Sequence, residues 1–180
     1  MRLCLAILAL IGALGTAPAQ AAETATAATA TAMVEAFEHF IRRSTPICED
    51  RPAIACVEAG WRFADRDGDS KVSLAELQDV RRGLLDWTEW RGDSLRKGER
   101  AAIAFGVWLA DAVGLENLLA SFNQNGDGGL SQAELLADVK LDQRPLGKVL
   151  LDPEAVDREA VAQRLGRFAP LLKGLLRPAE

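Results

Sequence analysis

Apolar residues recur at intervals of three and four along most of the chain, which is the spacing of helices that bury one face. This pattern predicts helices over residues 33–43, 53–64, 74–87, 99–113, 115–122 and 132–141, and a last helix that starts after Asp152 and runs towards residue 172. Alanine and leucine dominate, tyrosine is absent and β-branched residues are sparse, so residue propensity favours helix as well. We therefore expect an all-α fold.

The apolar positions of each helix identify the faces that we expect to be buried. In chain order, these are Met33, Phe37, Phe40 and Ile41; Val57, Trp61 and Ala64; Leu77, Val80, Leu84 and Trp87; Ala101, Phe105, Trp108 and Leu109; Leu115, Leu118, Leu119 and Phe122; and Val156, Leu165, Phe168 and Leu172. Gly106 would allow another helix to approach closely, and Gly114 marks a joint. Pro46 and Pro52 are expected to break the chain between the first two helices.

The N-terminal segment has the features of a secretory signal peptide over residues 1–21. Arg2 gives a positive start, residues 3–14 are continuously apolar, and small residues near position 20 offer cleavage sites. Residues 22–32 are rich in alanine and threonine and predict a flexible linker before a helical domain over residues 33–180. The expected location is periplasmic or secreted. An uncleaved membrane anchor is the alternative, although the apolar run is short for a membrane span.

Export would give meaning to the cysteines. If Cys4 leaves with the signal peptide, Cys48 and Cys56 remain as an even pair in an oxidising compartment. A disulfide between them would tie the first helix to the second and stabilise the fold by about 2–3 kcal/mol. The alternative is a redox-active or metal-binding pair, but the spacing is not CxxC and the single histidine, His39, lies elsewhere.

Composition and charge exclude some classes of function. The chain is 49% hydrophobic and 26% charged, which is typical of a globular protein. Its net charge of -5 gives a nucleic-acid partner no electrostatic support. No arrangement of nucleophile and histidine, no pair of catalytic glutamates outside the acidic loops and no phosphate-binding loop is present, so we expect no enzyme activity.

Acidic side chains alternate along residues 65–76, between the second and third predicted helices. Such spacing directs oxygens from one side of a tight loop towards a single Ca²⁺, a hard cation that takes six to eight oxygen ligands. The expected ligands of this first loop are Asp65, Asp67, Asp69, the carbonyl of Lys71, Ser73 and Glu76. Val72 is the apolar residue through which such loops pair. A solvated acidic turn with a helix-capping box at Ser73 and Glu76 is the alternative, but it leaves the three aspartates unexplained.

Residues 123–134 repeat the first loop position for position, and this internal repeat makes a chance capping box a poor explanation. The expected ligands of this second loop are Asn123, Asn125, Asp127, the carbonyl of Gly129, Ser131 and Glu134.

On these residues the chain resembles the EF-hand family, and in particular small exported bacterial EF-hand proteins. The resemblance covers residues 53–82 and 115–141, and it implies an all-α domain built around a pair of helix–loop–helix motifs with extra flanking and inserted helices. Ser70 stands where the family has glycine, at a strain cost of about 1 kcal/mol. Asn123 replaces a nearly universal aspartate, and Gly129 is expected to add slack. The first loop offers four carboxylates and the second two, so we expect tighter binding at the first.

The resemblance implies calcium binding in an exported protein that acts as a calcium buffer or as a calcium-stabilised interaction module, with an envelope protein as a candidate partner. The alternative is a partner-binding structural protein whose loops are degenerate. The C-terminal basic residues, among them Arg164 and Arg167, could serve membrane or target binding, but an amphipathic helix that covers the core explains them more simply. We therefore expect no membrane association once the signal is cleaved.

Overall fold

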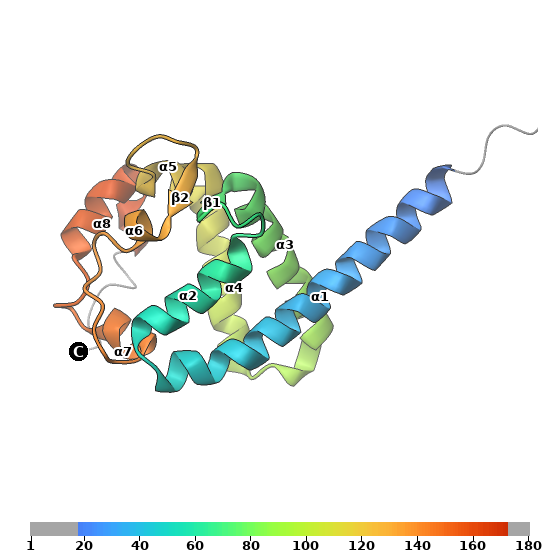
Figure 1. The fold of residues 1–180 in the computed structure, drawn as a ribbon, viewed down its shortest axis with the longest axis horizontal. Helices are drawn as coiled ribbons and strands as arrows, with labels where there is room; N and C mark the ends of the chain where they lie inside the picture. Colours follow the sequence, from blue (N-terminus) through green and yellow to red (C-terminus); the bar gives the residue numbers. More distant parts are fainter. Residues whose placement is uncertain (1–17, 173–180) are drawn as a thin grey trace, which may run out of the picture.

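The computed structural model describes the backbone of residues 18–172 and the side chains of residues 31–170. It is mostly helical, which confirms the all-α class (Figure 1). The elements are α1 (Pro18–Asp50), α2 (Ala53–Ala64), β1 (Lys71–Ser73), α3 (Leu74–Arg91), η1 (Gly92–Ser94), α4 (Lys97–Val113), α5 (Leu115–Phe122), β2 (Gly129–Ser131), α6 (Gln132–Leu135), α7 (Leu146–Leu151), α8 (Arg158–Leu165), η2 (Gly166–Phe168) and α9 (Ala169–Leu172).

Helix α1 packs along α3 and α2, and aromatic rings fill the contact. Phe37 is buried, with its ring edge-on to Phe63 of α2 at 4.7 Å, while Phe40 stacks on Phe63 at 4.3 Å. Gly83 of α3 faces this cluster, and a Cβ atom there would lie 2.5 Å from the Phe37 ring and 2.6 Å from Met33. The glycine therefore sets how closely α1 and α3 approach.

A disulfide links the C-terminal part of α1 to α2. The sulfurs of Cys48 and Cys56 are 1.96 Å apart, so the cysteine pairing expected from the sequence is present. Beside it, Ala53 at the start of α2 is fully buried against Val149 of α7 and Ala155, and its N–H donates to the Arg144 carbonyl at 2.8 Å. This apolar cluster holds the C-terminal part of the chain against α2.

The two acidic loops meet through a short antiparallel pair of strands. Val72 of β1 lies opposite Leu130 of β2, and both side chains are buried. The contact expected at Val72 is therefore present, and it joins segments almost sixty residues apart. Figure 1 shows β1 and β2 side by side at one end of the helical body.

Helix α1 extends further in both directions than the sequence predicted. Residues 22–32, expected to be a flexible linker, are helical, because alanine has the highest helix propensity and overrides the weaker preference of threonine. Pro46, expected to break the chain, lies inside α1. Neighbouring Thr45 donates its hydroxyl to the Ile41 carbonyl at 2.7 Å, a bond that accompanies bent helices. Residues 1–17, most of the predicted signal peptide, lie outside the described residues.

Helix α4 does not bury the face that its apolar spacing suggested. Ala101 is exposed, and Phe105 and Trp108 are 39% and 52% exposed, although their rings contact each other at 5.6 Å. Nothing lies within 4 Å of a Cβ atom at Gly106, so no helix makes the expected close approach there. Helix α4 packs mainly against α5, which it meets at a 79° bend at Gly114, and this packing leaves the Phe105 and Trp108 face largely uncovered.

Hydropathy identifies no single helix among the described residues as a membrane span. The pair formed by α4 and α5 passes the same test only if both are taken together across their bend.

The segment after the second loop also departs from the prediction. The helix expected over residues 132–141 ends at Leu135, because Val139 forms a bridge with Val156 and the Asp157 N–H donates to the Asp138 carbonyl. The unpredicted α7 follows. Asp152 caps no helix start: the predicted last helix is divided into α8, η2 and α9, and the N-cap of α8 is Asp157.

Candidate functional site

The first loop is held between the end of α2 and the first turn of α3. Helix α2 ends at Ala64, and Asp65 leaves it in an extended conformation. At the other end, Ser73 and Glu76 form a reciprocal capping box: the Ser73 hydroxyl accepts from the Glu76 N–H, and the Glu76 carboxylate accepts from the Ser73 N–H. This capping box fixes where α3 begins and aims the Glu76 carboxylate back over the loop.

Three carboxylates converge in the first loop. One oxygen each from Asp65, Asp67 and Glu76 lie within 4.8 Å of one another. Oxygens on opposite sides of an ion that binds them at 2.0–2.6 Å would be about 4–5 Å apart, so this set of donors could hold a single divalent cation. Oxygen donors of this kind suit a hard cation and not a soft one.

Main-chain N–H groups hold the aspartates of this loop in place. The two oxygens of Asp65 accept from the N–H groups of Gly68 at 2.8 Å and Ser70 at 3.0 Å. Asp67 accepts from the Asp69 N–H at 3.1 Å, and Asp69 accepts from the Lys71 N–H at 2.8 Å. These bonds position the side chains, and no lysine or arginine among the described residues forms an ion pair with the three aspartates.

Glu76 is the buried member of the set, at 8% exposure. Burial alone would raise the pKa of its carboxyl group, but hydrogen bonds from the Ser73 and Arg66 N–H groups outweigh burial and leave the pKa of Glu76 below its usual range. The side chain is therefore held as a carboxylate that spans the loop, with one oxygen on the Arg66 N–H at 2.7 Å and the other on Ser73.

Both loops follow the same backbone path. The fourth and sixth places are left-handed in each, with φ of 75° at Gly68 and 72° at Ser70 in the first loop, and 69° at Gly126 and 88° at Gly128 in the second. Ser70 is the one non-glycine residue with positive φ among the described residues. The strain expected at this serine is thus present.

The second loop repeats the hydrogen bonds of the first with fewer charges. Asn123 accepts from the Gly126 N–H at 2.9 Å, and Asn125 accepts from the Asp127 N–H at 3.0 Å. Glu134 accepts from the Gln124 N–H at 2.9 Å and from the Ser131 hydroxyl at 2.7 Å. These bonds lower the pKa of Glu134, with the Ser131 hydroxyl as the largest cause.

A side chain of the first loop reaches into the second. The Lys71 ammonium nitrogen lies 2.7 Å from Asp127 Oδ2, and Asn125 Nδ2 donates to the same oxygen at 2.8 Å. This contact is the largest cause that lowers the pKa of Asp127, and it raises the pKa of Lys71. Sequence reasoning assigned Lys71 only a carbonyl ligand and missed its side chain. No local signal in either loop points to this contact, because it depends on the register between β1 and β2.

Gly129 was expected to make the second loop more flexible, but the structure indicates a different role. It is buried in β2, its φ is not left-handed, and a Cβ atom there would lie 2.9 Å from Lys71 Cβ and 3.1 Å from Lys71 Cδ. Because Gly129 has no side chain, the aliphatic stem of Lys71 can pass over it to reach Asp127.

The predicted site residues all lie in the two loops, which adjoin across the strand pair. The structure brings together the carboxylates of Asp65, Asp67 and Glu76, whereas Asp69, Lys71 and Ser73 line the remainder of the same loop. In the second loop, Asn123, Asn125, Asp127, Ser131 and Glu134 are connected by hydrogen bonds within the loop, and Gly129 lies in β2; among the described residues, converging carboxylates are found in the first loop alone. His39, which was given no role, is exposed.

Comparisons of the chain with protein-family models, with curated proteins and with solved structures found no match.

Proposed function

We propose that the protein binds Ca²⁺ through the first loop and, more weakly, through the second, as an exported EF-hand protein. The observation that carries this proposal is the convergence of Asp65, Asp67 and Glu76 oxygens within 4.8 Å, inside a loop that the chain repeats. Ca²⁺ accepts six to eight oxygens without strict geometry, so the carbonyl of Lys71 and the side chains of Asp69 and Ser73 would complete its shell.

The two sites differ in net charge. The first loop contributes Asp65, Asp67, Asp69 and Glu76, whereas the second contributes Asp127 and Glu134, and the Asp127 charge is offset by Lys71. Affinity of such loops follows the number of charged ligands and the rigidity of the site. We therefore assign the tighter event to the first loop.

Calcium bound there would join α2 to α3 and thereby stabilise the fold. Outside the cytoplasm, sites with dissociation constants of about 10⁻⁴–10⁻³ M respond to ambient calcium, and a tighter site is filled permanently. A weak second site suits a buffer, and a tight first site suits a calcium-stabilised interaction module. A disulfide such as Cys48–Cys56 is compatible with an extracellular location, and the apolar run over residues 3–14 supports export.

The test is calorimetric titration of chelator-treated protein with Ca²⁺ and with Mg²⁺. Glu76→Gln should weaken the tighter event by at least about 100-fold, because even changes outside the coordination shell cost about 10–100-fold. The matched variant Glu134→Gln should leave that event unchanged. If Glu134→Gln abolishes it instead, the ranking of the sites is wrong. If wild-type protein gives no heat with Ca²⁺, the chain is a partner-binding protein with degenerate loops.

Export has its own measurement. Mature protein recovered from the cell envelope should start near residues 20–23 and should contain no thiol that alkylates under non-reducing conditions. Intact mass spectrometry that finds Met1 retained, or two reactive cysteines in the folded protein, would count against export.

A further inference from the structure

One residue takes part in both loops. The backbone N–H of Lys71 donates to Asp69 of the first loop at 2.8 Å, while its ammonium group lies 2.7 Å from Asp127 of the second. Lys71 is also paired with Ser131 across the two strands, so its backbone position is fixed by the sheet. A positive charge that belongs to the first loop is thereby delivered to the fifth-place acidic residue of the second.

The surroundings of Lys71 are shaped for this crossing. Gly129 leaves the space through which the aliphatic stem passes, since a Cβ atom at that position would collide with it at 2.9 Å. The acceptor is prepared as well: the other oxygen of Asp127 is held by the Gly129 N–H at 3.1 Å, and Asn125 donates to the oxygen that Lys71 binds. The two side chains are 39% and 29% exposed, so the contact is partly shielded from solvent.

We propose that the Lys71 ammonium group is an internal competitor for the second loop, which lowers the affinity of that loop for a divalent cation by occupying Asp127. This inference rests on the proposed calcium-binding function. A divalent ion that takes Asp127 as a ligand must either displace the ammonium group or bind within about 5 Å of it. Even with the dielectric constant of bulk water, repulsion between the ammonium group and a doubly charged ion at that distance corresponds to at least about a tenfold loss of affinity. Lys71 thus widens the difference in affinity that the different ligands of the two loops already produce.

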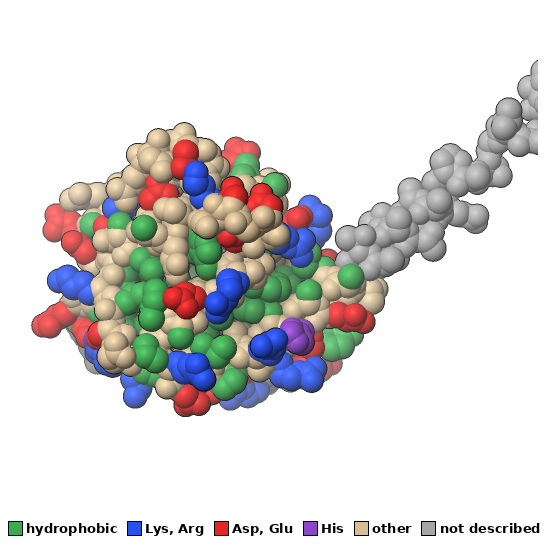
Figure 2. Space-filling model, viewed as in Figure 1, with side chains coloured by type: hydrophobic (Ala, Val, Ile, Leu, Met, Phe, Trp, Pro, Cys, Tyr) green, Lys and Arg blue, Asp and Glu red, His purple; other side chains and the backbone are tan. Residues whose placement is uncertain are grey.

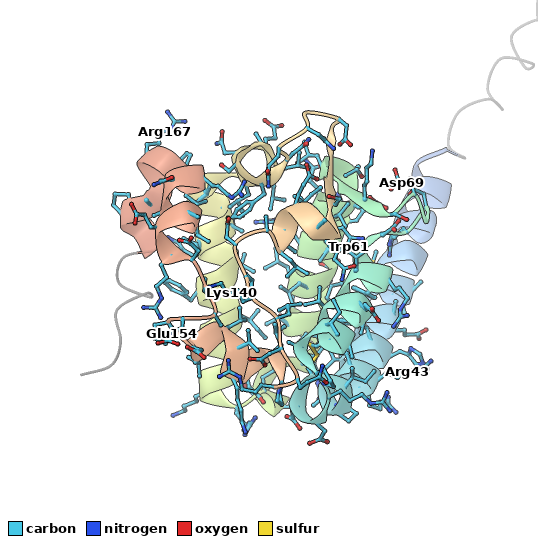
Figure 3. All side chains as sticks on the ribbon, turned by 60° about the vertical axis from the view of Figure 1, so that its left-hand side comes forward. Arg43, Trp61, Asp69, Lys140, Glu154 and Arg167 are labelled. Atoms are coloured by element: carbon cyan, nitrogen blue, oxygen red, sulfur yellow. A yellow bond between two sulfur atoms is a disulfide. The ribbon has the colours of Figure 1, made fainter. Side chains whose placement is uncertain are left out.

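The decisive variant is Lys71→Met, which keeps the stem and removes the charge. Calorimetric titration with Ca²⁺ should show the weaker event tightened about tenfold, with the tighter event changed much less. Lys140→Met is the matched control, because it removes the same charge from an exposed lysine that Figure 3 shows well away from Asp69 of the first loop. Lys71→Arg, which keeps the charge, should retain the weak affinity of the wild-type second loop.

A further readout needs no bound metal: in chelator, the ammonium protons of Lys71 should exchange with water more slowly in NMR spectra than those of Lys140. Asp127→Asn, or saturation with Ca²⁺, should remove the difference.

The outcomes separate this inference from the proposed function. Two binding events in wild-type protein, with the weaker one unchanged within about twofold in Lys71→Met, would overturn the competition and leave calcium binding intact. One event in wild-type protein and two in Lys71→Met would support it. No heat with Ca²⁺ in wild-type protein and in every variant would overturn both.

Discussion

The first and second loops share a backbone but neutralise their acidic side chains in different ways. In the first loop, main-chain N–H groups hold Asp65, Asp67 and Asp69. Among the residues that the structure describes, no basic side chain forms an ion pair with these aspartates. In the second, asparagines replace two of the acids and Lys71 contacts Asp127. The comparison shows that turn positions and side-chain-to-backbone bonds determine the loop shape, whereas the charge within that shape varies separately.

The largest effect should come from the contact that both loops share. Leu130→Ala removes a buried side chain opposite Val72 and should reduce the free energy of unfolding by about 3 kcal/mol. Urea denaturation in chelator measures this loss, and binding at both loops should weaken together. Leu151→Ala, at a residue 81% exposed, is the control and should change stability by less than about 0.5 kcal/mol. If binding weakens at one loop only, the strand pair does not support them jointly.

The second-largest effect should come from the removal of calcium, which should affect the two loops differently. At a calcium concentration a hundred times the dissociation constant, binding adds about 2.7 kcal/mol to stability, which for this chain length raises the melting temperature by about 5–10 °C. Glu76→Gln should lose most of this rise and Glu134→Gln little of it. The measurement is a thermal melt in chelator, in millimolar Mg²⁺ and in millimolar Ca²⁺, with Trp61 fluorescence near Asp65 as a second probe. Three superimposable curves would contradict calcium binding.

The smallest effect concerns the sixth place of each loop. Ser70→Gly relieves a left-handed serine and should stabilise the protein by about 0.5–1 kcal/mol, while Gly128→Ser introduces the same strain and should destabilise it by about 1 kcal/mol. Denaturant midpoints in chelator compare the two variants directly. Equal effects of the same sign would mean that the loops do not share a backbone path in solution.

Local signals predicted the parts of the fold that depend on neighbours in sequence. The bounds of α2 and α5, the two loops and the strained Ser70 follow from spacing within a dozen residues. Periodicity also grouped Phe105 and Trp108 on one face of α4, but it holds no information on whether another element meets that face. Figure 2 shows apolar side chains reaching the surface among charged ones, which sequence patterns alone do not reveal.

In the second half of the chain, the features that the sequence analysis predicted wrongly or missed depended on contacts between distant segments. The helix that contains Glu134 ends early because Val139 pairs with Val156. The sequence of residues 132–141 alone does not predict that bridge. The Lys71–Asp127 contact likewise exists only once the strand register is known. Local propensity describes which conformations are available, and these long-range contacts select among them.

The bond between Glu76 and the Arg66 N–H also has a consequence for the order of folding. It closes a segment of ten residues, whereas pairing of β1 with β2 closes a chain of about sixty. The entropy of loop closure makes the longer closure less favourable by about 1.6 kcal/mol. Each acidic loop can therefore adopt its own turn early, and the strands come together afterwards. Lys71 meets Asp127 only at that later step, so the two loops form as independent units and become electrostatically linked last.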